Sequence, residues 1–173
     1  MSLGVLPSLL AAAFPAGLLA AAIADAASFT IPNRITAALA LAFLPAALAL
    51  HLPWPVIGVC AATGAAALLL GVGMFAMGWC GGGDAKLLAA CALWLGWPAI
   101  PSLLLATSIA GGVLALGLML ARKAAPEAVL AGAPAWLGRL LGVQRDLPYG
   151  VAIAAGALFA LPMSPLFAAI GRS

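Results

Sequence analysis

The feature that most constrains this chain is a series of apolar runs, separated by short segments that carry nearly all of the charge. Of its 173 residues, 66% are hydrophobic and 6% are charged, whereas a soluble domain carries roughly 25% charged residues. Inside a bilayer only helices and closed barrels satisfy the backbone hydrogen bonds, and barrel strands alternate polar and apolar residues. These runs are apolar on all sides. The sequence therefore predicts an all-α, polytopic membrane helix bundle, forming a single integral membrane domain over residues 1–173.

Six membrane-crossing helices are predicted, because about 20 apolar residues span the hydrocarbon core. The predicted spans are 3–24, 35–50, 56–77, 85–97, 102–121 and 148–170. The fourth is short, so we expect it either to recruit residues around Ile100, beyond Pro98, or to lie in a thinned or protein-lined region. Residues 122–147 are expected to form a charged loop, in which 134–141 is either a short interfacial helix or plain linker.

The distribution of basic residues predicts the orientation of these spans. An even number of crossings places both chain ends on one side, where only Arg172 lies. The basic residues of the opposite side are Arg34, Lys86, Arg122, Lys123, Arg139 and Arg145. The positive-inside rule then predicts cytoplasmic charged loops and both termini outside. We interpret the net charge of +3 as a determinant of orientation in the lipid bilayer, and we expect no nucleic-acid partner.

No metal or other cofactor is predicted. The cysteines Cys60, Cys80 and Cys91 are widely spaced and form neither a CxxC nor a His-bearing metal pattern. We expect them to be small buried apolar residues. His51 lies at the outer end of the second span and is predicted to be an interfacial residue.

The four acidic residues fall into two classes. Glu127 and Asp146 lie among arginines in the charged loop and are expected to be solvated. Asp25 follows the first span directly and Asp84 opens the fourth. An acid at membrane depth is costly and is by default a functional hypothesis. Two alternatives stay open: Asp84 as a helix N-cap, a position that Asp favours, and Asp25 as an ordinary boundary residue.

The predicted topology places both acids at the same depth. The first span ends and the fourth begins at the cytoplasmic face, although Asp25 and Asp84 are 59 positions apart (84 − 25). Carboxylates that share a proton can activate a water molecule and protonate a carbonyl oxygen, which is the chemistry of aspartic proteolysis. Residues 81–83 are three glycines, which leave bare backbone beside Asp84 where an extended substrate segment could pair. The alternative for these glycines is a flexible loop.

The residues around both acids resemble a known family. The matching segments are Gly81-Gly82-Gly83-Asp84, which fits the GxGD signature of intramembrane-type aspartic peptidases, Asp25 followed by Ile31-Pro32-Asn33, Asp84-Ala-Lys86-Leu-Leu, and Pro148-Tyr149-Gly150. The last three resemble the first-aspartate region, the fourth helix and the last helix of the prepilin peptidases. The resemblance extends over nearly the whole chain.

What this resemblance implies is a type 4 prepilin-like leader peptidase, a multi-pass protein of the bacterial inner membrane. Such enzymes remove the basic leader of pilin or pseudopilin precursors at the cytoplasmic face, usually after a glycine. Larger members carry an N-methyltransferase region with paired CxxC motifs. This sequence contains no such motif and is similar to the compact, peptidase-only branch that serves Flp/Tad-type pili. Relatives often have basic residues between the first aspartate and Ile-Pro-Asn, whereas residues 26–30 here have none, which bears on leader recognition.

The resemblance also implies a set of site residues. The implied catalytic residues are Asp25 and Asp84, and the implied substrate-positioning residues are Pro32, Asn33, Gly81, Gly82, Gly83, Lys86 and Tyr149. Helix dipoles favour an ionised Asp84 at a helix start and a protonated Asp25 at a helix end.

Three of the surrounding residues keep two interpretations each. Lys86 either tunes the acid pair or anchors the chain at the cytoplasmic face. Tyr149 either lines the substrate groove or belongs to an aromatic belt. Arg34 is either a topology anchor or a partner that orders a loop.

Two other classes of protein fit six spans with membrane acids. A small proton-coupled transporter would use the same acids, but a carrier site lies near the midplane, typically at broken helices. A structural subunit of a secretion apparatus would carry them incidentally. Cleavage of a co-expressed precursor separates a peptidase from both.

Overall fold

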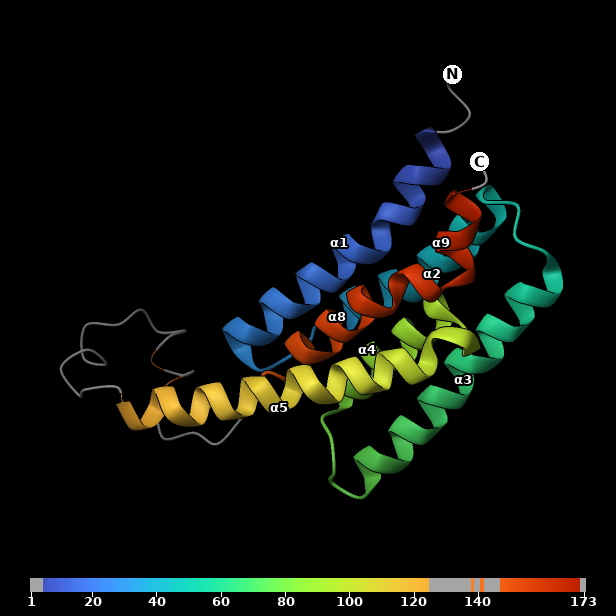
Figure 1. The fold of residues 1–173 in the computed structure, drawn as a ribbon. Helices are drawn as coiled ribbons and strands as arrows, with labels where there is room; N and C mark the ends of the chain where they lie inside the picture. Colours follow the sequence, from blue (N-terminus) through green and yellow to red (C-terminus); the bar gives the residue numbers. More distant parts are fainter. Residues whose placement is uncertain (1–4, 125–137, 139–140, 142–146, 172–173) are drawn as a thin grey trace.

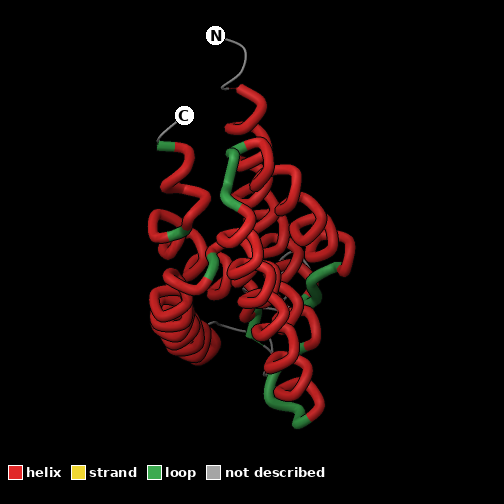
Figure 2. Tube along the Cα trace, turned by 90° about the vertical axis from the view of Figure 1, so that its right-hand side faces the viewer, coloured by secondary structure: helices red, strands yellow, loops and turns green. Residues whose placement is uncertain are grey.

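The computed structural model describes residues 5–124, 138, 141 and 147–171. Within these ranges every regular element is a helix, as Figure 2 shows, so the predicted all-α fold is confirmed. Three helices are long and apolar enough to cross a membrane: Leu10–Ser28, Trp54–Ala76 and Trp97–Ala124. Two further apolar helices, Asn33–Ala49 and Tyr149–Met163, are shorter. The proposed helix at 134–141 falls almost entirely outside the described residues.

The elements follow one another as predicted, with boundaries that prolines set in several places. In order they are α1 (Val5–Ser28), α2 (Asn33–Ala49), α3 (Trp54–Ala76), α4 (Gly82–Leu95), η1 (Trp97–Ala99), α5 (Ile100–Ala124), α8 (Tyr149–Ala160), η2 (Leu161–Met163) and α9 (Pro165–Ile170) (Figure 1). Pro32, Pro53 and Pro148 precede α2, α3 and α8 directly. A proline is tolerated at a helix start because its missing N–H would have no intrahelical partner there.

The fourth predicted span does not extend beyond Pro98. Helix α4 ends at Leu95, because Gly96 adopts a left-handed conformation with φ of +66°. The short helix η1 then leads directly into α5, so Ile100 begins the next helix and the idea that the fourth span recruits it is wrong. The protein-lined alternative fits the observed α4, since residues on most of its surface are buried. They are Ala85, Leu87, Ala89, Ala90, Cys91, Ala92, Trp94 and Leu95.

The sixth predicted span, 148–170, consists of several helical segments and is not one continuous helix. Helix α8 gives way at residue 161 to η2, and Ser164 is extended, with φ of −81° and ψ of 148°. Pro162 and Pro165 lack the backbone N–H that a continuing helix needs. The Ser164 hydroxyl instead accepts a hydrogen bond from the Phe167 N–H at 3.1 Å and caps α9.

The core centres on Trp94 of α4. Its ring stacks on Phe14 of α1 with centroids 5.0 Å apart and meets the edge of Phe43 of α2 at 5.9 Å. The indole Nε1 donates to the Leu39 carbonyl of α2 at 2.8 Å. Buried aromatic pairs of this kind add about 0.5–1.5 kcal/mol beyond the area they bury. One side chain therefore ties α4 to both α1 and α2.

The remaining helices pack on this core where glycines allow close approach. Helix α3 lies on α4, where a Cβ on Gly64 would come within 2.8 Å of Leu93 Cβ, and α5 lies on α8, where Gly156 contacts Thr107. Small residues at helix crossings are typical of membrane bundles, where lipid supplies no hydrophobic drive for association. Cys60 and Cys91 are buried as predicted, whereas Cys80 is half-buried.

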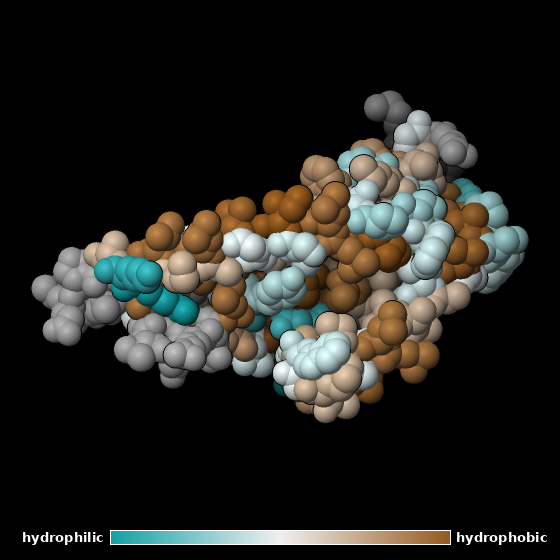
Figure 3. Space-filling model, turned by 60° about the horizontal axis from the view of Figure 1, so that its bottom comes forward, coloured by the Kyte–Doolittle hydropathy of each residue, from teal (hydrophilic) through white to brown (hydrophobic). Residues whose placement is uncertain are grey.

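The outward surface is dominated by apolar side chains. Figure 3 shows hydrophobic residues over much of the visible face, with the strongest hydrophilic colour toward one end of the molecule. The last turn of α5 contains Arg122 and Lys123. At the opposite end of the molecule, the start of α1, the turn between α2 and α3, and α9 lie near one another (Figure 1). His51 lies in that turn, away from both predicted acids.

Candidate active site

Asp25 lies inside the last turn of α1, which extends four residues beyond the predicted span end to Ser28. The helix ends because Phe29 takes a positive φ of 52° and its N–H bonds back to the Asp25 carbonyl at 2.7 Å. The Asp25 side chain is only 4% exposed. An ordinary boundary residue would face water or lipid headgroups, so that alternative is wrong.

The buried Asp25 carboxyl group is held by the start of α8. The Gly150 N–H donates to Asp25 Oδ2 at 2.7 Å, across 125 residues of chain, and the backbone of Val151 also hydrogen-bonds the carboxyl group. The first N–H groups of a helix have no intrahelical partner and carry partial positive charge. Gly150 leaves space for this contact, since a Cβ there would lie 2.8 Å from Asp25 Oδ2.

Asp84 is the third residue of α4, and the N-cap is Gly81, so the prediction that Asp84 might be the N-cap is wrong. Its carboxyl group folds back onto the backbone N–H of Gly81, as the acid at the third position of a capping box does. Gly82 and Gly83 form the first turn of the helix, so they are not part of a flexible loop. Gly81 is extended and exposed.

The two acids converge through the turn between α1 and α2. Ile31 of this turn is buried and packs between Gly83 of α4 and Gly150 of α8. Asp25 and Asp84 are close enough for their carboxyl groups to interact electrostatically. The structure therefore brings together the two acids that the sequence singles out.

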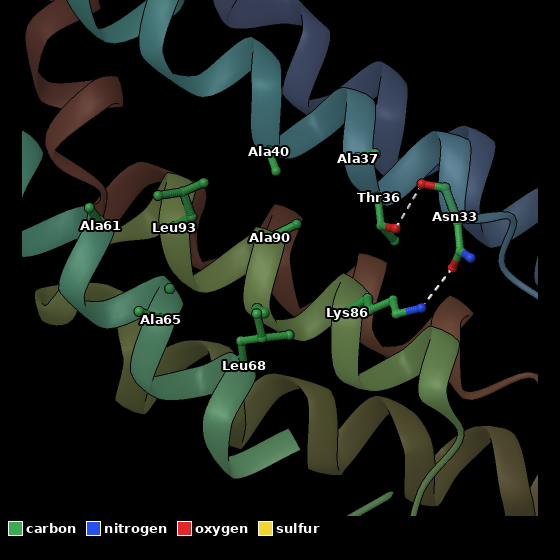
Figure 4. A pocket seen from close by; sticks show the side chains of 12 residues that line it. Asn33, Thr36, Ala37, Ala40, Ala61, Ala65, Leu68, Lys86, Ala90 and Leu93 are labelled. Atoms are coloured by element: carbon green, nitrogen blue, oxygen red, sulfur yellow. Dashed lines mark hydrogen bonds between the residues drawn. The ribbon is translucent and has the colours of Figure 1, made fainter. Parts of the chain in front are cut away.

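Lys86 points to a different neighbour. Residues two apart on a helix do not face the same side, and the Lys86 Nζ donates to the Asn33 Oδ1 at 2.9 Å. Figure 4 shows this pair at one end of a groove of about 480 Å³ between α2, α3 and α4. The Thr36 hydroxyl donates to the Asn33 carbonyl at 3.1 Å, which fixes the start of α2 further. Lys86 thus links α4 to the Ile-Pro-Asn turn.

The remaining residues that the sequence singles out are Pro32, Tyr149 and Arg34. Pro32 is the extended residue before α2, and its carbonyl accepts the Ile35 N–H at 3.0 Å. The Tyr149 ring packs over Gly111 of α5 and is 38% exposed. Arg34 is exposed on α2.

Cys80 precedes the glycines and lies near Asp84. Its Sγ donates to the Gly71 carbonyl at 3.9 Å. Burial, and then the charge of Asp84, raises the pKa of the Cys80 thiol, which keeps it protonated. Within the described ranges no three His, Cys, Asp or Glu side chains gather as a metal site requires.

Two residues of the site were not assigned a role from the sequence. Gly150 supplies the hydrogen bond to Asp25, and Ile31 fills the space between the two glycines. A glycine in the first turn of a helix, directly after Pro148-Tyr149, is a signal for close backbone approach. No pattern in the sequence indicates which side chain it approaches.

Comparison with known proteins gives matches to one family. The sequence model described as "Type IV leader peptidase family" matches residues 12–116, which include both aspartates and the glycines before Asp84. Proteins named "Prepilin leader peptidase/N-methyltransferase" from Aeromonas salmonicida and Aeromonas hydrophila are 51% identical over 43 residues. That segment is 25% of this chain and only 15% of each relative. No solved structure matches this chain.

Proposed function

Since this chain belongs to the type IV leader peptidase family, we propose that it is a membrane aspartic endopeptidase that removes the basic leader from type IV or Flp-type prepilins or pseudopilins. The observation that carries the proposal is the convergence of Asp25 and Asp84. They come from helices far apart in the chain and interact where α1, α4 and α8 meet. An isolated buried carboxyl group would only destabilise the bundle, whereas two neighbouring ones can share a proton.

The arrangement supports different roles for the two carboxyl groups, one as a proton acceptor and the other as a proton donor. Asp25 Oδ2 is occupied by the Gly150 N–H, and the Asp84 carboxyl group is oriented by the Gly81 backbone. Each acid is thus held by backbone groups that cannot rotate away. In the proposed reaction the ionised acid takes a proton from water while the protonated acid donates to the scissile carbonyl oxygen. The attack then forms a tetrahedral intermediate, and its collapse returns a proton to the leaving amine.

The substrate in this proposal is a membrane helix that continues into a basic leader. A helix hides its peptide carbonyls in hydrogen bonds, so the segment to be cut has to unwind before attack. The extended, exposed Gly81 lies directly beside the Asp84 carboxyl group, where a side chain would obstruct an incoming strand. We place this site at the cytoplasmic face of the bacterial inner membrane, with both termini outside, because of the predicted positive-inside bias.

Co-expression with a candidate prepilin tests the proposal. The wild-type protein should shorten the precursor, and Asp25→Asn or Asp84→Asn should each reduce cleavage by about 10²–10⁴-fold, the usual contribution of a general acid or base. The double variant should be scarcely worse than either single variant, because the two groups act as a unit.

The matched control is Gly112→Ala on α5, where a Cβ would meet no atom within 4 Å. This variant should cleave as the wild type does and reach the same membrane level. Full cleavage by either Asn variant would contradict the proposal. An intact precursor in wild-type cells would contradict it as well and would favour a carrier or a structural subunit.

A further inference from the structure

Ile31 occupies an unusual position for a residue in a turn. Its side chain is only 4% exposed, although it lies in the turn between the end of α1 and the start of α2. Its side chain extends from Gly83, which directly precedes Asp84, to Gly150, whose N–H binds Asp25. The same side chain therefore contacts the two backbone segments that hold the two acids.

The fit on both sides of Ile31 is close. A Cβ on Gly83 would lie 3.2 Å from the Ile31 Cβ, and a Cβ on Gly150 would lie 2.7 Å from the Ile31 Cδ1. Real side-chain carbons seldom approach so closely, and packed interiors give way only at a cost. Only glycine leaves enough space at both positions while isoleucine fills the gap.

The turn that carries Ile31 is itself fixed. The Ser28 hydroxyl donates to the Ala24 carbonyl at 2.8 Å, and the Phe29 N–H closes the end of α1. On the other side of the turn, the Lys86 ammonium ties Asn33 to α4. Isoleucine adds stiffness of its own, because a β-branched side chain has few accessible χ1 angles.

We propose that Ile31 is a positioning residue that sets the separation and relative orientation of the Asp25 and Asp84 carboxyl groups. This inference rests on the proposed function, since it gives the spacing of the pair a catalytic role. Ile31 itself touches no reacting atom in this account. It acts through Gly83 and Gly150, which it holds apart.

Two linked carboxyl groups titrate in two steps, and the gap between the steps reflects their coupling. Removing the Ile31 Cδ1 loosens the packing at Gly150 and lets the separation of the pair fluctuate. Ile31→Val should therefore lower kcat about 3- to 10-fold, leave KM unchanged and narrow the bell-shaped pH profile. Among the described residues, the titratable side chains on the segments that hold the pair are Cys80 before α4, Lys86 on α4 and Tyr149 at the start of α8, and none of them is altered in this variant.

The matched control is Ile57→Val, the same deletion at a buried position of α3 near the opposite end of the molecule. It should lower the midpoint of thermal unfolding as much as Ile31→Val does, with an unchanged kcat and pH profile. A purely structural role for Ile31 predicts that the two variants behave alike in all three measurements.

A size-compensation pair gives a second test. Gly150→Ala places a methyl group against both the Ile31 Cδ1 and the Asp25 Oδ2. Ile31→Val removes the first of these clashes, so Gly150→Ala combined with Ile31→Val should recover about tenfold of the kcat lost in Gly150→Ala alone. The experiment uses the full chain in detergent with a purified precursor.

The outcomes separate this inference from the proposed function. If wild type cleaves, the Asn variants do not, and Ile31→Val keeps the wild-type kcat and pH profile with no compensation in the double variant, the positioning role is overturned while the peptidase stands. If the Asn variants still cleave, the proposed function fails and the inference fails with it. A reduced kcat, a narrowed profile and compensation together support the positioning role.

Discussion

The two acids of this protein are held in different ways. Asp84 is oriented by Gly81, three positions earlier in the chain and part of the same helix start. Asp25 is oriented by Gly150, 125 positions later and on another helix. The first arrangement is local and needs only the first turn of α4. The second exists only when α1 and α8 are packed together, so the geometry of the pair depends on the tertiary fold through Asp25.

This contrast predicts that the geometry of the acid pair depends more on contacts between helices distant in the chain than on the glycines beside Asp84. Substitutions that disturb the long-range contacts should therefore have larger effects than substitutions at the local contact.

Trp94→Ala should have the largest effect, a loss of about 3–5 kcal/mol in the free energy of unfolding, the usual range for a buried tryptophan. The change removes the stack on Phe14, the edge contact with Phe43 and the hydrogen bond to Leu39. Denaturant titration in detergent, followed by circular dichroism, measures it. Trp97→Ala is the control, since Trp97 is 69% exposed, and equal losses in the two variants would contradict the central place of Trp94.

Gly150→Ala should come next, with a loss of about 10- to 100-fold in kcat. Overpacking of about 1–3 kcal/mol corresponds to roughly 5- to 160-fold at 1.36 kcal/mol per tenfold, and the expected loss lies within these limits. The added methyl group would displace the Asp25 carboxyl group from the start of α8. Steady-state cleavage of a purified precursor measures the loss, and Gly112→Ala again serves as the control.

Gly81→Ala should cost less than Gly150→Ala, about threefold to tenfold in kcat. A Cβ there would lie 3.0 Å from the Asp84 Oδ2, but Gly81 is exposed and its φ of −71° suits alanine. Helix ends fray more readily than helix interiors, so a substitution at the N-cap of α4 should disturb the site less than one at a packed helix contact. If Gly81→Ala reduces kcat more than Gly150→Ala under the same assay, the contrast between local and long-range support is wrong.

Lys86→Met should have the smallest effect, no more than about threefold in kcat. It removes one hydrogen bond to Asn33, and because this bond is exposed, water can replace the lost partner on both sides. Because Lys86 points away from the acid pair, the pH–activity profile should not move. A shift of the profile in Lys86→Met, absent in the control Lys123→Met, would show instead that Lys86 tunes the pair.

Much of the fold could be predicted from the sequence because lipid imposes it. The apolar runs predict the helices, and the predicted second span, 35–50, ends within one residue of the end of α2 at Ala49. The errors fall where local and tertiary preferences compete. Ala121, the predicted end of the fifth span, lies within α5, which continues to Ala124 because Arg122 and Lys123 favour a helix C-terminus. The break after α8 could not be predicted, because the effect of Pro162 on the helix opposes that of a strongly apolar run.

In the candidate site too, features that depend on local sequence could be predicted and features that depend on tertiary packing could not. The GxGD pattern singles out Asp84, and the alternating direction of the spans predicts that Asp25, at the end of the first span, lies on the same face as the start of the fourth. The hydrogen bond from Gly150 and the packing of Ile31 could not be predicted, since they depend on how α8 lies against α1. Lys86 was expected either to tune the pair or to anchor the chain at the cytoplasmic face, and its contact with Asn33 could not be predicted from the sequence.

Cross-linking between positions 25 and 84 tests the central claim most directly. Cysteines replace both acids in a chain whose native cysteines are alanine, and a short bifunctional thiol reagent is applied in membranes before the linked peptides are identified by mass spectrometry. We predict an intramolecular 25–84 link in high yield, and no link in the matched variant with cysteines at 25 and 51, since residue 51 belongs to the turn between α2 and α3 at the opposite end of the bundle (Figure 1). A 25–51 link without a 25–84 link would contradict the account.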